Sequence, residues 1–228
     1  SYAALACIAI QSNQNDQHGG QAIADFDYGM ADGVRKTFVR MYRQNLARAV
    51  LLLEGGEDPE GVLKDIIAEV EAETGLRPTL EDNEAYATAE LPKLTPRFGN
   101  EEELRKAQRF AHYRAVKETD LATYQAMEAL IHNLNTMHSR AGAQTPFSSI
   151  NYGTDTSPEG RMVMKNILLS TEAGLGGGET PIFPIQIFRV KEGINYNPGE
   201  PNYDLFQLAI RCSAKRLPVS YTHLTLPT

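Results

Sequence analysis

The chain has 228 residues, 42% of them hydrophobic, and its 22 Lys and Arg residues against 29 Asp and Glu residues give a formal net charge of −7. With 18 Gly and 12 Pro, near ordinary usage, the composition excludes collagen-like, low-complexity and disordered proteins. No apolar run approaches the roughly 18 residues that span a bilayer. The acidic balance, without a run of Lys or Arg, argues against a nucleic-acid partner. We therefore expect a cytoplasmic protein with no membrane or nucleic-acid partner.

The cysteine and histidine patterns point to no metal site. Cys7 and Cys212 both lie in apolar segments, which predicts two buried, reduced thiols. Two cysteines cannot make a four-cysteine zinc site, and no two of the five histidines have HxH or HxxxH spacing. The chain opens on an apolar segment without Met or a basic stretch, which argues against a signal peptide and predicts an internal fragment.

The N-terminal segment combines an apolar and a polar stretch. Its alanines favour a helix over 1–12, although Ile8 and Ile10 would also suit a strand. The amide-rich stretch 11–21 predicts a solvated loop, with a sugar- or nucleotide-binding loop as the alternative. His18 in that stretch is a weak acid–base candidate.

Helical periodicity dominates the next hundred residues. Asp58 as a cap with Pro59 at the first helical position is a strong helix start. Three prolines predict an irregular connection, and Thr119 is a possible break in the helical region that follows it. The expected elements are a helix over 32–54, a helix over 58–74, a connection over 76–99 and a helical region over 100–139.

The pattern then changes to strand, helix, strand. We expect strands over 144–152 and 181–190, with a helix over 157–173 between them. A helix of that length between two strands implies a parallel crossover, and hence an α/β sheet or barrel. Asn202 is expected to cap a last helix with Cys212 on its inner side.

Two glycine-containing segments could bind phosphate. The segment 174–180 (GLGGGET) lacks the GK[ST] ending of a phosphate loop and follows a helix, so it is expected to be a helix C-cap and tight turn. The segment 151–161 leaves a strand and enters a helix, where free N–H groups attract anions, with Arg161 and Lys165 adding positive charge. Ser157 is then either a helix cap alone or a cap with an additional ligand role.

The strand over 144–152 carries polar side chains on one face. Ser149 and Asn151 share that face with Phe147, because side chains alternate along a strand. Either structural partners or substrate hydroxyls would satisfy them. No nucleophile or acid–base constellation emerges from these residues.

Several long stretches resemble the anaerobic (class III) ribonucleoside-triphosphate reductases, a family of glycyl-radical enzymes. They are SNQNDQHGGQAIADFDYGMADGVRKTF, ALIHNLNTMHSRAGAQTPFSSINYGTDTSPEGRMVMKNILLSTEAGLG, GETPIFPIQIFRVKEGINYN and NYDLFQLAIRCSAKRL. The resemblance covers about 1–217. It implies part of a ten-stranded α/β barrel of the formate-lyase type, with several long helices.

The resemblance also implies a radical mechanism. In that family a glycyl radical oxidises a cysteine, the thiyl radical removes the ribose 3′ hydrogen, the 2′-hydroxyl leaves as water, and formate commonly supplies the reducing equivalents. A radical-SAM iron–sulfur enzyme installs the radical. The family implies a homodimer, ATP or dNTP effectors, an ATP cone and a structural zinc site.

Much of that machinery has no counterpart in this sequence. It contains no RxxGY motif, no zinc cysteines and no cone, and neither cysteine matches a radical-relay position. We therefore expect no catalytic residue here, an internal piece of the catalytic domain over 1–217, and no activity from the isolated chain. The stretch 218–228 departs from the family and is expected to be a non-native tail.

The resemblance assigns roles to two groups of residues. The substrate-binding candidates are Ser148, Ser149, Asn151, Thr154, Thr156 and Ser157. Lys36 and Arg40 are effector or dimer candidates, on a helix expected to pack against the helical region 100–139. The alternatives are a glycyl-radical enzyme with another substrate and a nucleotide-binding module without chemistry.

Overall fold

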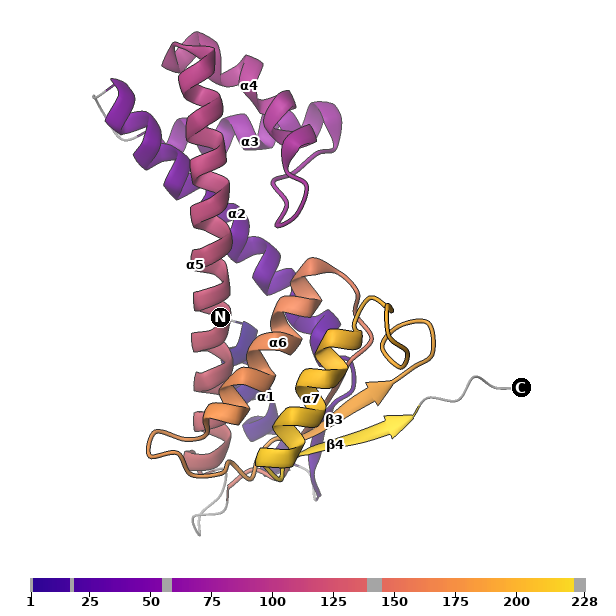
Figure 1. Cartoon of the computed structure of the whole chain (residues 1–228). Helices are drawn as coiled ribbons and strands as arrows, with labels where there is room; N and C mark the ends of the chain where they lie inside the picture. Colours follow the sequence, from indigo (N-terminus) through magenta and orange to yellow (C-terminus); the bar gives the residue numbers. More distant parts are fainter. Residues whose placement is uncertain (1, 17–18, 55–58, 139–144, 224–228) are drawn as a thin grey trace. The chain divides into compact units, whose positions relative to one another are not determined.

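The computed structural model describes residues 2–16, 19–54, 59–138 and 145–223 (Figure 1). The chain forms two compact units. The sheet unit comprises Ser1–Gly33 and Ala122–Thr228, and the helical unit comprises Val34–Leu121. No linker separates them in sequence, because helices α2 (Phe26–Glu54) and α5 (Glu101–Thr136) each contribute residues to both units.

A four-stranded parallel sheet in the order β1-β2-β3-β4 organises the sheet unit. The strands are β1 (Gln21–Ile23), β2 (Ser148–Tyr152), β3 (Ile185–Val190) and β4 (Val219–His223). The parallel pairing of β2 with β3 confirms the predicted strand–helix–strand crossover and the α/β class. The ten-stranded barrel stays a prediction.

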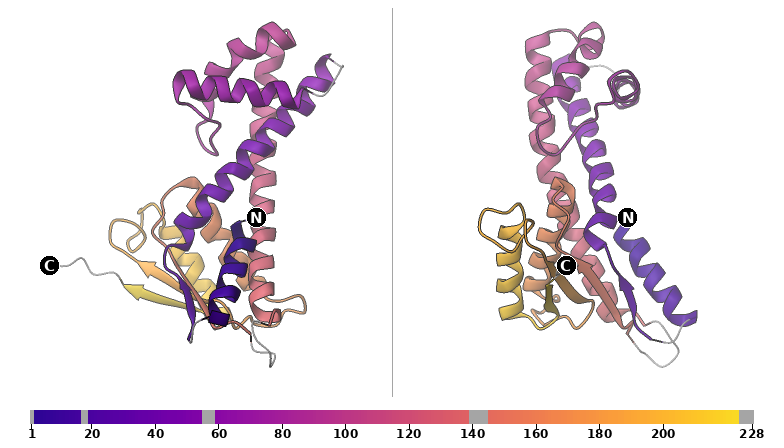
Figure 2. Two further views of the ribbon diagram at one scale, coloured as in Figure 1. Left: turned by 180° about the vertical axis from the view of Figure 1, so that it is seen from behind. Right: turned by 90° about the vertical axis from the view of Figure 1, so that its right-hand side faces the viewer.

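Two helices cover one face of this sheet, α6 (Pro158–Ala173) and α7 (Tyr203–Lys215), as Figures 1 and 2 show. A buried hydrogen-bonded chain runs through this layer: the Tyr152 hydroxyl donates to Gln186 Oε1, and Gln186 Nε2 donates to Thr171 Oγ1, both at 2.7 Å. Paired donors and acceptors let these polar groups lie in the core at little cost. Cys212 is fully buried in the same layer, as predicted.

Part of the C-terminal segment expected to be a non-native tail, Val219–His223, forms the last strand of the sheet, and its non-native origin stays a prediction. It pairs in parallel with β3, and Gln186 and Phe188 are in register with Val219 and Tyr221. Val219 is buried, and the Tyr221 ring packs edge-on against Phe206 with centroids 6.2 Å apart. The alternation of apolar side chains in this segment suits a strand, whatever its origin.

Two N-terminal elements differ from their predicted bounds. Helix α1 (Tyr2–Asp16) extends into the polar stretch expected to be a loop, and His18 lies outside the described residues. Helix α2 begins at Phe26 and contains Gly33, which was expected near a helix start. A Cβ at Gly33 would lie 2.9 Å from the Tyr2 ring, so this glycine permits close packing of the two helices.

In the helical unit, the predicted end of α3 (Glu60–Thr74) agrees with the structure, but the helix begins one residue later than predicted, because Pro59 was expected at the first helical position. Pro59 occupies the N-cap position, and Gly75 ends the helix with a left-handed φ of 72°. Asp58, the predicted cap, lies outside the described residues. Helix α5 is continuous through Thr119, where a break was considered possible.

Helix α4 (Glu84–Phe98) overturns the predicted irregular connection. Pro92 and Pro96 lie inside this helix, four residues apart and both exposed, so the carbonyl groups that lose their N–H partners lie on the solvent side. Leu91 and Leu94 are buried on the other side. Burial of that face outweighs the two missing hydrogen bonds. Within the described residues, no helix has the length and apolarity needed to cross a membrane.

Candidate functional site

Strand β2 separates the predicted substrate residues onto two faces. Ser149 and Asn151 are half-buried and share the face opposite α6 and α7, next to Ile185 and Ile187 of β3. This shared face is as the alternation predicted. Ser148 lies on the helix-covered face, where it is buried and its hydroxyl donates to the carbonyl of Pro146 at 3.3 Å.

Asn151 carries the one unsatisfied polar atom of this strand. Its Oδ1 is buried and has no hydrogen-bond donor among the residues that the structure describes. Native proteins pair nearly all buried side-chain acceptors, so an orphaned amide oxygen needs an explanation. A ligand hydroxyl or N–H that donates to Oδ1 would supply it.

The turn that follows β2 is built around a carboxylate from a distant segment. Asp27 Oδ2 accepts hydrogen bonds from the backbone N–H groups of Gly153, Thr154 and Asp155 at 2.9, 3.1 and 3.0 Å. Asp27 is fully buried in the first turn of α2. The anion that these amides attract is therefore an internal carboxylate.

The N-terminus of α6 is capped by its own side chains. The Ser157 hydroxyl accepts the N–H of Gly160 at 3.1 Å, which confirms Ser157 as the helix cap. Asp155 Oδ1 accepts the N–H of Ser157 at 2.9 Å. The side chains of Thr154 and Thr156, both at least partly exposed, lie in this same turn.

The loop after β3 closes over the turn after β2. Asn195 Nδ2 donates to the carbonyls of Gly153 and Arg189 at 2.8 and 2.9 Å. Asn202 Nδ2 donates to the carbonyls of Gly153 and Asp155 at 3.2 and 2.8 Å. Asn202 thus begins α7, as predicted, but its amide holds the neighbouring turn and makes no capping bond.

Arg189 connects the ends of β1 and β3. Its Nη1 donates to Asp25 Oδ1 at 2.7 Å, and its Nη2 lies 3.6 Å from Asp27 Oδ1. The C-terminal ends of three parallel strands therefore meet in one polar network, at the edge of the sheet where α/β proteins bind ligands. The sequence did not identify Asp27, Arg189 or Asn195: no strand was predicted over Gln21–Ile23, and the three residues come together only in the assembled sheet.

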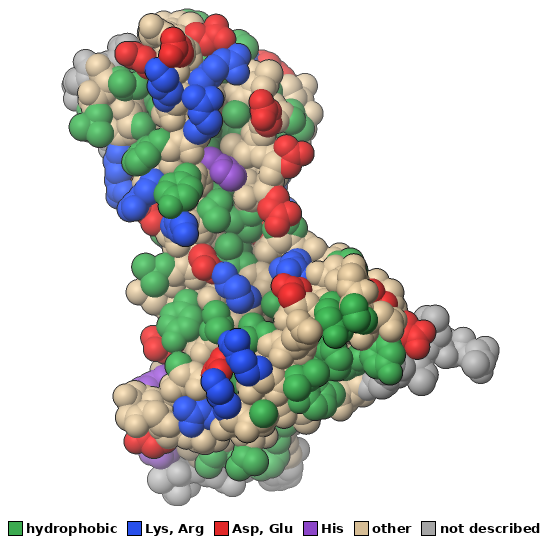
Figure 3. Space-filling model, viewed as in Figure 1, with side chains coloured by type: hydrophobic (Ala, Val, Ile, Leu, Met, Phe, Trp, Pro, Cys, Tyr) green, Lys and Arg blue, Asp and Glu red, His purple; other side chains and the backbone are tan. Residues whose placement is uncertain are grey.

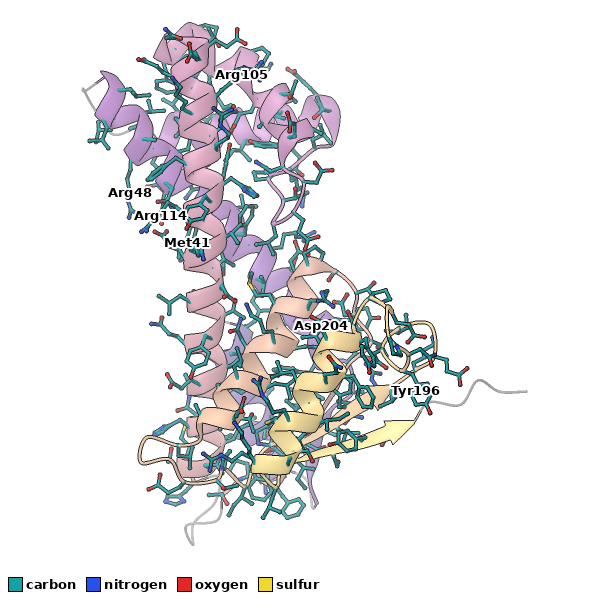
Figure 4. All side chains as sticks on the ribbon, in the orientation of Figure 1. Met41, Arg48, Arg105, Arg114, Tyr196 and Asp204 are labelled. Carbon is teal, nitrogen blue, oxygen red and sulfur yellow. The ribbon has the colours of Figure 1, made fainter. Side chains whose placement is uncertain are left out.

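A groove of about 490 Å³ lies between α6 and α7. The arginines that line it are already paired with carboxylates. Arg161 pairs with Asp204 at 2.7 Å, and Arg211 pairs with Glu172 at 2.8 Å. Figure 3 shows the Lys and Arg side chains on this side of the sheet unit, and Figure 4 labels Asp204 at the start of α7. The predicted positive charge of Arg161 thus anchors α7 to α6.

The two cysteines do not resemble reactive thiols. Burial raises the pKa of Cys7, and burial raises the pKa of Cys212 to about 11. Both are free and buried, as the sequence predicted. No group of three or more potential metal ligands occurs among the described residues.

The effector and dimer candidates lie in the helical unit. Lys36 and Arg40 are exposed on α2, away from its buried residue Phe38. The predicted packing of this helix against α5 is present: the Phe38 and His112 rings meet at 5.6 Å, and Asn45 Nδ2 donates to Glu118 Oε2 at 2.7 Å. Figure 4 labels other cations of these two helices, including Arg48 and Arg114.

Comparison with known proteins gives one family. The family described as anaerobic ribonucleoside-triphosphate reductase matches residues 1–226. The protein of that name from Escherichia coli K12 is 39% identical over 112 residues, which is 49% of this chain and 15% of the relative. The enterobacteria phage T4 protein of that name is 43% identical over 104 residues, 45% of this chain and 17% of the relative. The aligned part is thus a small fraction of each relative.

Proposed function

The chain belongs to the anaerobic ribonucleoside-triphosphate reductase family, and from this premise we propose that it forms part of the catalytic domain of an enzyme that reduces ribonucleoside triphosphates to deoxyribonucleoside triphosphates for DNA synthesis. The relatives of that name support the reaction class. The observation that carries the local proposal is the orphaned Oδ1 of Asn151, on the half-buried face of β2 opposite α6 and α7 and beside the C-terminal edge of the sheet.

Ser149 and Asn151 are suited to orient a ribose. Their hydroxyl and amide groups donate and accept hydrogen bonds without carrying charge. Neither group titrates near neutral pH, so both keep the same hydrogen-bonding character throughout a reaction that moves hydrogen atoms. Asn151 Oδ1 would accept a hydrogen bond from a sugar hydroxyl, and the neighbouring Ile185 and Ile187 would exclude water from that face.

The substrate's phosphates would approach the turn after β2 through side chains. The N–H groups of Gly153, Thr154 and Asp155 are bound to Asp27. The hydroxyls of Thr154 and Thr156 are the groups that we assign to the phosphates, with the dipole of α6 contributing positive potential. Ser157 would contribute by capping α6, which stabilises the helix end that faces the phosphates.

We assign the radical machinery to parts of the complete enzyme outside this chain. A glycyl radical in those parts of the enzyme would supply the hydrogen-atom transfer chemistry that starts the reduction. Neither Cys7 nor Cys212 matches a radical-relay position of the family, and the two lie buried in separate helices, so we assign neither to the relay nor to a zinc site. Formate as reductant, a radical-SAM activating enzyme, zinc and a cytoplasmic location complete the proposal.

Substitution of Asn151 tests the proposal. In the complete activated enzyme, Asn151→Ala should raise KM for CTP or lower kcat by roughly tenfold or more, since a lost substrate hydrogen bond is worth about 1.5 kcal/mol. The matched control is Asn135→Ala. Asn135 Oδ1 accepts hydrogen bonds from the N–H groups of Ile182 and Phe183, which precede the N-terminal end of β3.

The control separates binding from stability. Asn135→Ala should lower the melting temperature and leave KM and kcat close to wild type. If Asn151→Ala shows the same pattern, with a lower melting temperature and unchanged kinetics, Asn151 has only a structural role and the proposal is wrong.

We also propose that the exposed face of α2 serves a homodimer interface or an ATP or dNTP effector site. Charge reversal by Lys36→Glu or Arg40→Glu in the complete enzyme should shift the dimer dissociation constant, or the dNTP concentration for half-maximal effect, by about threefold to tenfold. Sedimentation velocity and effector titration measure these quantities. If both stay at wild-type values in both variants, the residues form only a solvated face.

A further inference from the structure

We propose that Asp27 is a positioning residue, which joins the C-terminal ends of β1, β2 and β3 and fixes the geometry of the substrate-binding face. The inference rests on the proposed function, because it deepens the account of the same site. It assigns a role to a residue far from β2 in sequence, at separations of 126 to 128 residues from its three amide donors.

The carboxylate of Asp27 fills an anion-binding nest. Three consecutive N–H groups, of Gly153, Thr154 and Asp155, converge on Oδ2 at 2.9 to 3.1 Å. Consecutive amides that point to one spot form a concavity that favours an anion. Hydrogen bonds to a charged acceptor are stronger than those between neutral groups, by a factor of roughly two. An apolar side chain at position 27 would leave three donors without an acceptor.

The second carboxylate oxygen reaches the other strand ends. Oδ1 accepts the N–H of Tyr28 at 3.1 Å, in the segment that follows β1. It also lies 3.6 Å from Nη2 of Arg189, near the end of β3. One carboxylate thus contacts the segments at the ends of all three strands.

This arrangement places Asp27 close to the proposed substrate groups through the backbone. Gly153 lies two residues after Asn151, and Thr154 carries one of the hydroxyls assigned to the phosphates. When the three N–H groups lose their acceptor, the turn is free to rotate, and both side chains then lose their fixed orientation. Asp27 need not touch the substrate to act in this way.

Hydrogen exchange tests the clamp without any assay of activity. In the complete enzyme, exchange in the peptide covering 152–158 should become at least tenfold faster in Asp27→Ala than in wild type. Asp25→Ala is the matched control, because Asp25 pairs with the same arginine but does not contact the nest. Sodium acetate should slow exchange again in Asp27→Ala alone, since a free carboxylate fits the vacated nest. Equal exchange in Asp27→Ala and wild type would overturn the proposal.

A double-mutant cycle tests the positioning role. Asp27→Ala should lower kcat/KM for CTP by tenfold or more in the wild-type background, and by a clearly smaller factor when Asn151 is already Ala, because only the effect through Thr154 then remains. Asp27→Asn, which retains one acceptor oxygen, should give an intermediate loss and replaces Asp27→Ala if that variant does not fold. Independent, multiplicative losses would overturn the positioning role.

The two proposals can fail separately. If Asn151→Ala alone leaves both kinetic constants unchanged, the proposed substrate contact is wrong, and so is a positioning role exerted through it. The exchange experiment still decides whether Asp27 holds the turn.

Discussion

Gly153→Ala should lower the free energy of unfolding of the sheet unit by at least about 3 kcal/mol. Gly153 has a φ of 134°, which side-chain-bearing residues rarely adopt. A Cβ there would lie 2.6 Å from the carbonyl oxygen and 3.0 Å from the nitrogen of Arg189. Both are backbone atoms of β3, so relief of the clash requires β2 and β3 to separate.

Gly29→Ala is the control for this substitution. Gly29 lies in α2, where a Cβ would meet no atom within 4 Å. The same change should therefore be neutral or stabilise by up to about 1 kcal/mol, because alanine favours a helix. Urea unfolding followed by circular dichroism measures both variants. Equal stability of the two variants would show that Gly153 is not constrained by β3.

The second large effect concerns a buried carboxylate in the helical unit. Glu90 is fully buried and accepts hydrogen bonds from the hydroxyls of Tyr42 and Tyr86 at 2.6 and 2.9 Å and from Gln108 Nε2 at 2.8 Å. Glu90→Ala leaves these donors unsatisfied around a cavity. We expect a loss of about 3 kcal/mol or more in the free energy of unfolding of the helical unit.

The pH dependence of this site has a defined sign. Burial raises the pKa of Glu90 above its ordinary value of 4.5, although hydrogen bonds from Tyr42, Gln108 and Tyr86 oppose the shift. The folded protein therefore retains a proton in a pH window where the unfolded chain has lost it. The Glu90 contribution to stability falls as pH rises from about 4.5 through the folded pKa.

Glu90→Gln isolates that contribution. The stability of this variant relative to wild type should increase between pH 4.5 and neutral pH, because glutamine does not titrate. Glu73→Gln is the control, since Glu73 is exposed and pairs with Lys93 at the surface. Urea midpoints at a series of pH values measure the difference. A relative stability of Glu90→Gln that stays constant or falls with pH would contradict the assigned shift.

Local features of this fold could be predicted from the sequence. The Ser157 cap, the shared face of Ser149 and Asn151 and the parallel strand pair each depend on residues close together in the chain. Helix α4 could not be predicted, because its two prolines oppose a helix locally and only the burial of Tyr86, Leu91 and Leu94 against other helices favours it.

The polar network at the strand ends could not be predicted from the sequence for another reason. Strand β1 has three residues, too few for a recognisable alternation, so Asp25 and Asp27 had no strand end to follow. The donors to Asp27 are backbone amides, which no side-chain motif reveals. Only the assembled sheet brings Asp27 and Arg189 to one edge.

The central claim is that the half-buried face of β2, with Ser149 and Asn151, binds the ribose of a nucleotide substrate. A thermodynamic cycle that combines a protein substitution with removal of a substrate hydroxyl tests it most directly. Calorimetry on the complete enzyme would compare CTP with analogues that lack the 2′- or the 3′-hydroxyl, for wild type and Asn151→Ala. The account predicts that removal of one of these hydroxyls weakens binding to wild type about fivefold to tenfold, and that the penalty disappears in Asn151→Ala. Equal penalties in both proteins for both hydroxyls would contradict it.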